Sequence, residues 1–144
     1  MTGSFLVGTY LVRPRVIKAV QEAPAPSYTP QNLDGEKVFQ LVNEWRLSEK
    51  KPVYIVDNRL CEIAKTRVKE IQTDFSHTKF RLRYDGSEFL LSENLSRNGT
   101  SENWVLYGWL NSPPHREILD MPYKYSCVAA DGTYVVQIFS NFEQ

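Results

Sequence analysis

The sequence predicts an α+β fold in which helices come first and a β-hairpin comes last. Two segments, over 34–50 and 57–71, carry an apolar residue every three or four positions, which is typical of amphipathic helices. Near the C-terminus, Asp131-Gly132 joins two runs rich in β-branched and aromatic residues, a strong hairpin signal. Both faces of this hairpin are apolar, so we expect helices to pack on both sides of the sheet.

The first helix should begin at Asp34, a favourable N-cap, and present one apolar face, formed by Val38, Leu41, Val42 and Trp45. Asp57 or Asn58 should cap the second helix, which carries Cys61 in its first turn. Its apolar stripe consists of Leu60, Ile63, Ala64, Val68 and Ile71. The periodicity is then lost from Asp74 to Gly99, which predicts a long ordered loop of a kind that is often functional.

Thr100 or Ser101 should cap a third helix, and we expect Trp104 and Trp109 both to lie in the core; the alternative is that one of them lines a groove. The stretch "WLNSPPHREIL" then predicts a short fourth helix with Ser112 as N-cap. Pro113 fits the first helical position, where its missing N–H has no consequence. His115 therefore falls near the third position, at the positive end of the helix.

The first 32 residues differ from the rest of the chain. "SFLVGTYLV" (4–12) is apolar but shorter than the roughly 20 residues that span a bilayer. It is interpreted either as the remnant of a signal or anchor, which would allow a membrane tether, or as a short element that packs on another surface. Three prolines in "EAPAPSYTPQN" (22–32) predict an extended linker. The domain should therefore occupy residues 33–144.

Composition and cysteine content limit the classes of function. Lysine and arginine balance aspartate and glutamate, so the formal net charge is zero and nucleic acid is not an expected partner. The two cysteines, Cys61 and Cys127, are far apart and form no C-x-x-C motif, which excludes a zinc knuckle. Two interpretations remain open for them: buried free thiols, or one disulfide and thus an oxidising compartment.

Three side chains are candidates for chemistry. The two histidines, His77 and His115, are separated by Glu93, which follows an apolar pair and needs a partner if it is drawn inside. Such a set can bind a divalent metal such as Zn²⁺, transfer protons, or form a buried polar network. Ser112 close to His115 also permits a nucleophile–base pair, although helix capping explains this serine without chemistry.

In this order, "FSHTKF", "SENLSRNG", "WLNSPPHREIL" and "YVVQIFSNF" resemble the motifs of the CAP superfamily of cysteine-rich secretory proteins, antigen 5 and pathogenesis-related proteins, and most closely its short bacterial branch. The resemblance covers about residues 33–142. It implies a three-layer α-β-α sandwich with a small antiparallel sheet. It also implies extracytoplasmic use, which makes a Cys61–Cys127 disulfide between helix and sheet plausible.

The resemblance further implies a central cavity. Carried over by motif, its first histidine is His77, its first glutamate is Glu93 with Asn94 beside it, and its second histidine is His115. The second glutamate of the family does not transfer, because Ser112 occupies that position, so the expected cavity is a triad that is less suited to holding a metal.

Three functions follow from this resemblance and the residues. The favoured one is an extracytoplasmic binding module for a lipid, peptide or cell-envelope ligand, with no required cofactor but with Zn²⁺ or another divalent metal as an option. The second is a metal-assisted hydrolase that uses His77, Glu93 and His115. In the third, the triad only orders the long loop.

Overall fold

The computed structural model describes residues 32–87 and 91–141, and the predicted apolar segment and nearly all of the linker lie outside these ranges. The described residues form five helices and a four-stranded sheet. Their bounds in chain order are α1 Gly35–Ser48, β1 Ile55–Val56, α2 Asn58–Glu70, α3 Thr78–Tyr84, β2 Leu91–Ser96, α4 Glu102–Leu110, α5 Pro113–Asp120, β3 Tyr125–Asp131 and β4 Tyr134–Ser140. Among them, no helix combines the length and the apolar character that crossing a bilayer requires.

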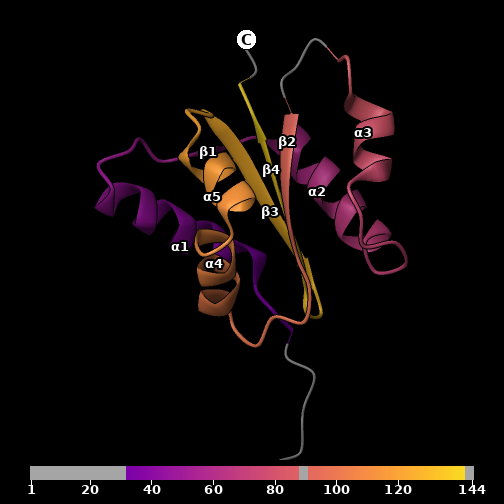
Figure 1. Ribbon diagram of the computed structural model, residues 1–144, viewed down its shortest axis with the longest axis horizontal. Helices are drawn as coiled ribbons and strands as arrows, with labels where there is room; N and C mark the ends of the chain where they lie inside the picture. Colours follow the sequence, from indigo (N-terminus) through magenta and orange to yellow (C-terminus); the bar gives the residue numbers. More distant parts are fainter. Residues whose placement is uncertain (1–31, 88–90, 142–144) are drawn as a thin grey trace, which may run out of the picture.

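The sheet separates two helical layers, as predicted. Its strand order is β1-β3-β4-β2, and β4 pairs antiparallel with both of its neighbours, β3 and β2. Helices α2 and α3 lie on one side of the sheet, and α1, α4 and α5 lie on the other (Figure 1). The sheet departs from a purely antiparallel one only at its edge, where the two-residue strand β1 runs parallel to β3. The α-β-α sandwich is therefore confirmed, with a mixed sheet.

Three of the four predicted helices, α1, α2 and α4, begin where a side chain accepts from their free N–H groups. The Asp34 carboxylate accepts from the backbone N–H groups of the next turn at 2.9 and 3.3 Å, and Asp57 does the same for α2. Ser101 caps α4 through its hydroxyl, which accepts from the backbone N–H of Trp104 at 3.1 Å. These caps confirm the predicted helix starts and select Asp57 and Ser101 from the two pairs of alternatives.

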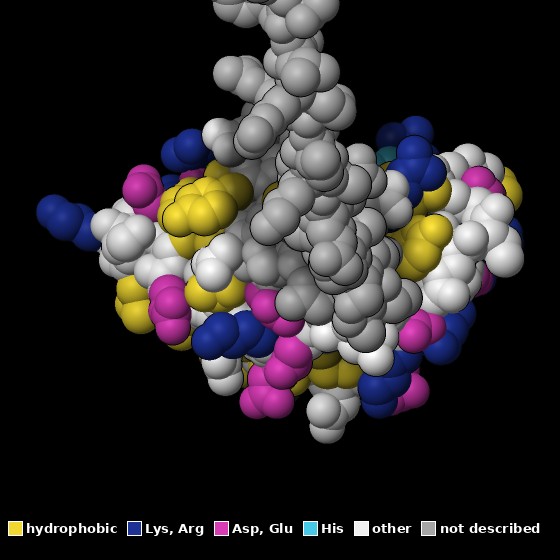
Figure 2. Space-filling model, turned by 90° about the horizontal axis from the view of Figure 1, so that it is seen from below, with side chains coloured by type: hydrophobic (Ala, Val, Ile, Leu, Met, Phe, Trp, Pro, Cys, Tyr) yellow, Lys and Arg dark blue, Asp and Glu magenta, His cyan; other side chains and the backbone are white. Residues whose placement is uncertain are grey.

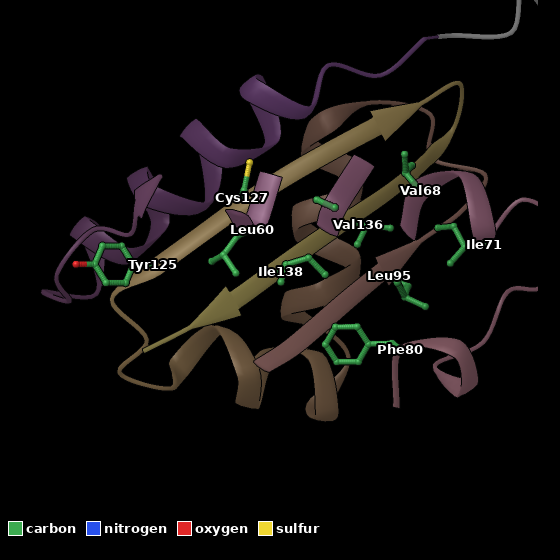
Figure 3. Packing of buried hydrophobic residues seen from close by; sticks show 10 residues of the cluster. Leu60, Val68, Ile71, Phe80, Leu95, Tyr125, Cys127, Val136 and Ile138 are labelled. Carbon is green, nitrogen blue, oxygen red and sulfur yellow. The ribbon is translucent and has the colours of Figure 1, made fainter. Parts of the chain in front are cut away.

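The hairpin also forms as predicted. Gly132 adopts φ +58°, a left-handed conformation that suits a two-residue turn and that glycine adopts without strain. Val136 and Ile138 pack toward α2, in the cluster drawn in Figure 3. Val135 and Phe139 pack toward α1 and α4 on the other face. The apolar character of both hairpin faces thus results in two cores, one on each side of the sheet.

The prediction of a continuous loop from Asp74 to Gly99 is wrong. This segment contains a helix, α3, and an edge strand, β2, which pairs with β4 along its whole length. Polar residues on both faces of the strand conceal its period of two. Glu93 lies between Leu91 and Leu95 on one face, and the other face is formed by Ser92, Asn94 and Ser96.

The two tryptophans have different environments. Trp109 is buried, and its indole N–H donates to the Leu95 carbonyl oxygen at 2.9 Å, which fastens α4 to β2. Trp104 is 45% exposed on the outer face of α4. The prediction that both lie in the core is therefore wrong for Trp104, because its position five residues before Trp109 turns it toward solvent.

A disulfide joins Cys61 in the first turn of α2 to Cys127 in β3. This confirms the bridge and excludes the alternative of two free thiols. It connects the helical layer formed by α2 to the centre of the sheet.

On the face of the molecule that Figure 2 draws, charged side chains are not separated by sign. Figure 2 shows basic and acidic side chains interspersed on the face seen from below, with hydrophobic patches between them. This distribution agrees with the formal net charge of zero.

Candidate functional site

The three predicted side chains come together at the outer edge of the sheet. A cleft of about 320 Å³ lies along β2, between α3 on one side of the sheet and α5 on the other. It contacts four consecutive residues, 91–94, whose side chains alternate between the two faces of the sheet, so it follows the open edge of the strand. Figure 1 shows β2 between these two helices. The helical layers contribute His77 and His115, and β2 contributes Glu93.

Glu93 and His77 are in direct contact. Oε1 of Glu93 lies 2.9 Å from Nδ1 of His77. A carboxylate only accepts hydrogen bonds, so Nδ1 carries the proton and Nε2 is the imidazole nitrogen left for a ligand. The Glu93 side chain is 1% exposed, whereas that of His77 is 40% exposed. The pair thus joins a buried anion to an imidazole at the mouth of the cleft.

Arg67 is the main site residue that the sequence analysis missed. Its buried guanidinium donates to both oxygens of Glu93, from Nε to Oε2 at 2.9 Å and from Nη2 to Oε1 at 2.8 Å. Nη1 also donates to Glu70 at 2.6 Å, and Nη2 donates to the Ser76 carbonyl at 2.9 Å. Two-point contact between guanidinium and carboxylate fixes the plane of the Glu93 side chain as well as its charge. Because Ser76 directly precedes His77, the same arginine fastens the start of α3.

A signal for Arg67 is present in the sequence. Arg67 lies seven residues after Leu60, three after Ala64 and four before Ile71, so it falls on the apolar stripe of α2. A cation at such a position requires a carboxylate partner inside the protein, and Glu93 requires a partner if its side chain is buried. The sequence thus contains a buried cation and a candidate buried anion that can pair.

His115 is hydrogen-bonded through both its imidazole ring and its backbone carbonyl. It occupies the third position of α5, as predicted, and its Nδ1 lies 2.7 Å from the Ser112 hydroxyl. Ser112 is the N-cap residue by position, but its side chain makes no capping hydrogen bond. The predicted capping role of this hydroxyl is therefore wrong, because it bonds the imidazole instead. Burial, and then the neighbouring His77, lower the pKa of His115, which favours its neutral form at pH 7.

Asn94 connects the strand to α5. Its Nδ2 donates to the His115 carbonyl oxygen at 3.1 Å, which fixes the separation between β2 and this helix at the cleft. The Asn94 side chain is buried, and its Oδ1 has no hydrogen-bond partner among the described residues. Asn94, predicted as a cavity residue by family resemblance, thus lines the cleft and also anchors its wall.

The residues present do not fit a three-ligand metal site. Among the described residues, no three histidine, cysteine, aspartate or glutamate side chains come together as a group that could hold an ion. Arg67 occupies both oxygens of Glu93 and neutralises its charge. What the cleft offers is the Nε2 atoms of two imidazoles, each ring oriented by a hydrogen bond at Nδ1. Two such atoms can accept from or donate to a polar group on a ligand.

No protein-family model matches the chain, and no curated protein matches its sequence. Its structure is similar to a cysteine-rich secretory protein of Staphylococcus aureus, with a TM-score of 0.67 and 19% identity over 75% of this chain. It is also similar to an extracellular protein of Bacillus anthracis that contains a SCP domain, with a TM-score of 0.65 and 24% identity over 74% of this chain. An outer surface protein of Borrelia burgdorferi matches with a TM-score of 0.62 and 21% identity, over 80% of this chain and 100% of its own.

The chain therefore has the fold of the SCP domain, also called the CAP domain. This confirms at the level of fold the resemblance that the four motifs indicated. The matched part is 38% of the length of the S. aureus protein and 40% of that of the B. anthracis protein.

Proposed function

We propose that this domain is an extracytoplasmic binding module whose cleft along β2 takes up a lipid, a peptide or another component of the cell envelope. The observation that carries the proposal is the convergence of His77, Glu93 and His115, from three separate elements, on one concave site. The cleft also has apolar walls, formed by Phe80, Leu91, Pro114 and Ile118. Ligand sites commonly combine such walls with a few oriented polar groups.

The state of Glu93 supports binding over hydrolysis. A general base must be able to approach and deprotonate a water molecule, but both Glu93 oxygens accept from the buried Arg67 guanidinium. The position where family members carry a second carboxylate is occupied by Ser112, whose hydroxyl is used to orient His115. The polar groups of the cleft are thus held in place, as recognition requires.

Two features support an extracytoplasmic location. The Cys61–Cys127 disulfide is a type of bond that persists in oxidising compartments and is rare in the cytosol. The similar S. aureus, B. anthracis and B. burgdorferi proteins are described as secretory, extracellular and outer-surface proteins, respectively.

A titration followed by ¹⁵N NMR tests the proposal. Three probes are added separately to the labelled protein: vesicles of anionic phospholipid, soluble cell-wall fragments, and a pool of blocked heptapeptides. We expect one probe to shift the amide signals of residues 91–94 and 115. The double variant His77→Ala/His115→Ala should bind that probe at least tenfold more weakly, whereas Leu82→Ala, at a residue 84% exposed on α3, should bind it as the wild type does. If none of the probes shifts these signals, the proposal is wrong.

Calorimetric titration with Zn²⁺ separates this module from a metallohydrolase. We expect the wild type to show no saturable heat of Zn²⁺ binding that depends on the two histidines, so its titration should match that of His77→Ala/His115→Ala. Saturable binding that requires both imidazoles would favour the metal-assisted alternative. The melting temperature of the metal-free double variant addresses the purely structural role of the triad, because a large decrease with no change in ligand binding would support it.

A further inference from the structure

A second concave site lies at the opposite edge of the sheet from the cleft. It is a groove of about 520 Å³ beside β1, between the end of α1 and the segment that follows α5. Strands β1 and β2 terminate the sheet on its two sides, so this groove is separate from the His77–His115 site. Its lining consists of Arg46, Lys51, Pro52, Val53, Ile55, Asp120, Pro122, Tyr123 and Lys124.

Arg46 is a buried cation that has no carboxylate partner among the residues that the structure describes. It is 2% exposed, and none of the ion pairs within the described residues includes it. Its Nε donates to the Pro52 carbonyl at 2.7 Å, and Nη1 donates to the Leu119 carbonyl at 2.6 Å, to the Tyr54 hydroxyl at 2.9 Å and to the Met121 carbonyl at 3.4 Å. These partners are uncharged, and Nη2 makes none of these bonds. Arg46 therefore differs from Arg67, whose charge is balanced by Glu93 and Glu70.

The guanidinium of Arg46 lies over the Tyr54 ring, 4.1 Å from its centroid, but among the described residues its neighbours do not supply a balancing negative charge. Burial raises the pKa of Tyr54 to about 12, against the opposing effect of Arg46, so its hydroxyl stays protonated at neutral pH. Among the described residues of the lining, Asp120 is the one carboxylate, and it is shared between Lys51 at 3.4 Å and Arg116 at 3.7 Å. With Lys124, the described part of the lining contains three cations and a single carboxylate.

One part of the groove wall, formed by Val53 and Ile55, is apolar and exposed to solvent. Val53 is 41% exposed and Ile55 is 50% exposed, which is high for aliphatic side chains next to a concave surface. The backbone N–H and C=O of Tyr54, beside this wall, are both bonded to the side chain of Asn43. A peptide strand added at this edge would therefore not find the backbone groups of Tyr54 free for hydrogen bonding, whereas an alkyl chain needs no hydrogen-bond partners.

We propose that this groove binds a carboxylate carried on a short unbranched apolar chain. The carboxylate would meet Arg46 and the two lysines, and the chain would cover the exposed side chains of Val53 and Ile55. Such a ligand supplies the charge that Arg46 lacks and removes apolar surface from water in a single binding event.

Octanoate is the probe, with 1-octanol and acetate as matched controls for its two parts. In ¹⁵N NMR titrations we expect octanoate to shift the amides of Val53, Ile55 and Lys124 and the side-chain Nε–H of Arg46. Octanol, which has the chain without the charge, and acetate, which has the charge without the chain, should each bind at least tenfold more weakly. Equal affinity for octanol would overturn the proposal, as would octanoate shifts confined to residues 91–94 and 115.

Variants test the charges without disturbing the buried arginine. Lys51→Gln/Lys124→Gln should weaken octanoate binding about fivefold or more, because it removes two cations of the groove. Lys65→Gln is the matched control, since Lys65 is exposed on α2 and lies outside the groove lining; it should not alter the affinity. Unchanged affinity in the double variant would contradict the proposed charge pairing. The cleft probes report separately on the β2 site, so either proposal can fail alone.

Discussion

Replacing Arg67 by methionine tests whether the buried ion pair holds the cleft together. The side chains of Arg67 and Glu93 are 0% and 1% exposed, so the variant leaves a buried carboxylate with His77 as its remaining side-chain partner. Removing one partner of a buried pair typically costs about 3–5 kcal/mol. Methionine fills much of the same volume, so little of this loss should come from a cavity. We therefore expect the free energy of unfolding to fall by about 4 kcal/mol.

Urea denaturation measures this loss. With a slope of about 2 kcal/mol per molar urea, 4 kcal/mol lowers the midpoint by about 2 M. Lys65→Met is the matched control on the same helix, because Lys65 pairs with Glu62 at 2.8 Å while both side chains are largely exposed. It should change the free energy by about 0.5 kcal/mol or less. If Arg67→Met costs no more than this control, the ion pair does not stabilise the site as argued.

A double variant separates the loss of the Arg67–Glu93 attraction from the cost of leaving the Glu93 carboxylate buried without its arginine. Arg67→Met/Glu93→Gln removes both formal charges, and a neutral amide is less costly to bury than a lone carboxylate. We expect it to recover about 1–3 kcal/mol of the loss caused by Arg67→Met, as measured by the same denaturation experiment. A double variant less stable than Arg67→Met would show that Glu93 is stabilised by partners other than the arginine.

Three further predictions concern the bridge, the pH response and the tryptophans. Cys61→Ser/Cys127→Ser removes a disulfide that spans 66 positions, and the chain-entropy model predicts that the free energy of unfolding falls by about 4 kcal/mol. Urea unfolding measures this loss, and a value below about 1 kcal/mol would argue against a stabilising role of the disulfide. Because the pKa of His115 is lowered from 6.5 in the folded state, the unfolded chain binds more protons below that pH. Thermal melts should therefore show the melting temperature falling from pH 7 to pH 5, and falling less in His115→Gln. Parallel curves for the two proteins would contradict this. Trp109→Phe should cost about 1–3 kcal/mol in urea unfolding and Trp104→Phe about 0.5 or less, and equal losses would refute the assigned environments.

The parts of the fold that could be predicted are those in which one residue type carries the signal. Asp34 marks a helix start by itself, the pair Asp57-Asn58 marks another, and Asp131-Gly132 marks the hairpin. Strand β2 could not be found in this way, because its burial depends on pairing with β4, some 40 residues later in the chain. A segment such as "LSENLS" lacks strand character until a partner and two helical layers cover it.

The candidate site shows the same division. His77, Glu93 and His115 could be identified because their sequence contexts are unusual and resemble family motifs. The groups that orient them are harder to assign: Arg67 falls on the apolar stripe of α2, which indicates burial but does not name its partner, and Ser112 resembles an N-cap. Their roles depend on which atoms the fold brings within hydrogen-bond distance, and sequence spacing does not contain that information.

The position of His77 follows from two attachments of α2 to the sheet. The Cys61–Cys127 disulfide holds the first turn of this helix to β3, and Arg67 holds its later part to Glu93 on β2. Arg67 also bonds the carbonyl of Ser76, so the chain enters α3 from a fixed point next to Glu93. Since the second attachment lies nearer to the cleft and needs no oxidation, reduction of the disulfide should lower stability while leaving the His77–Glu93 contact in place. In this domain the bridge therefore stabilises the fold, and the buried arginine shapes the site.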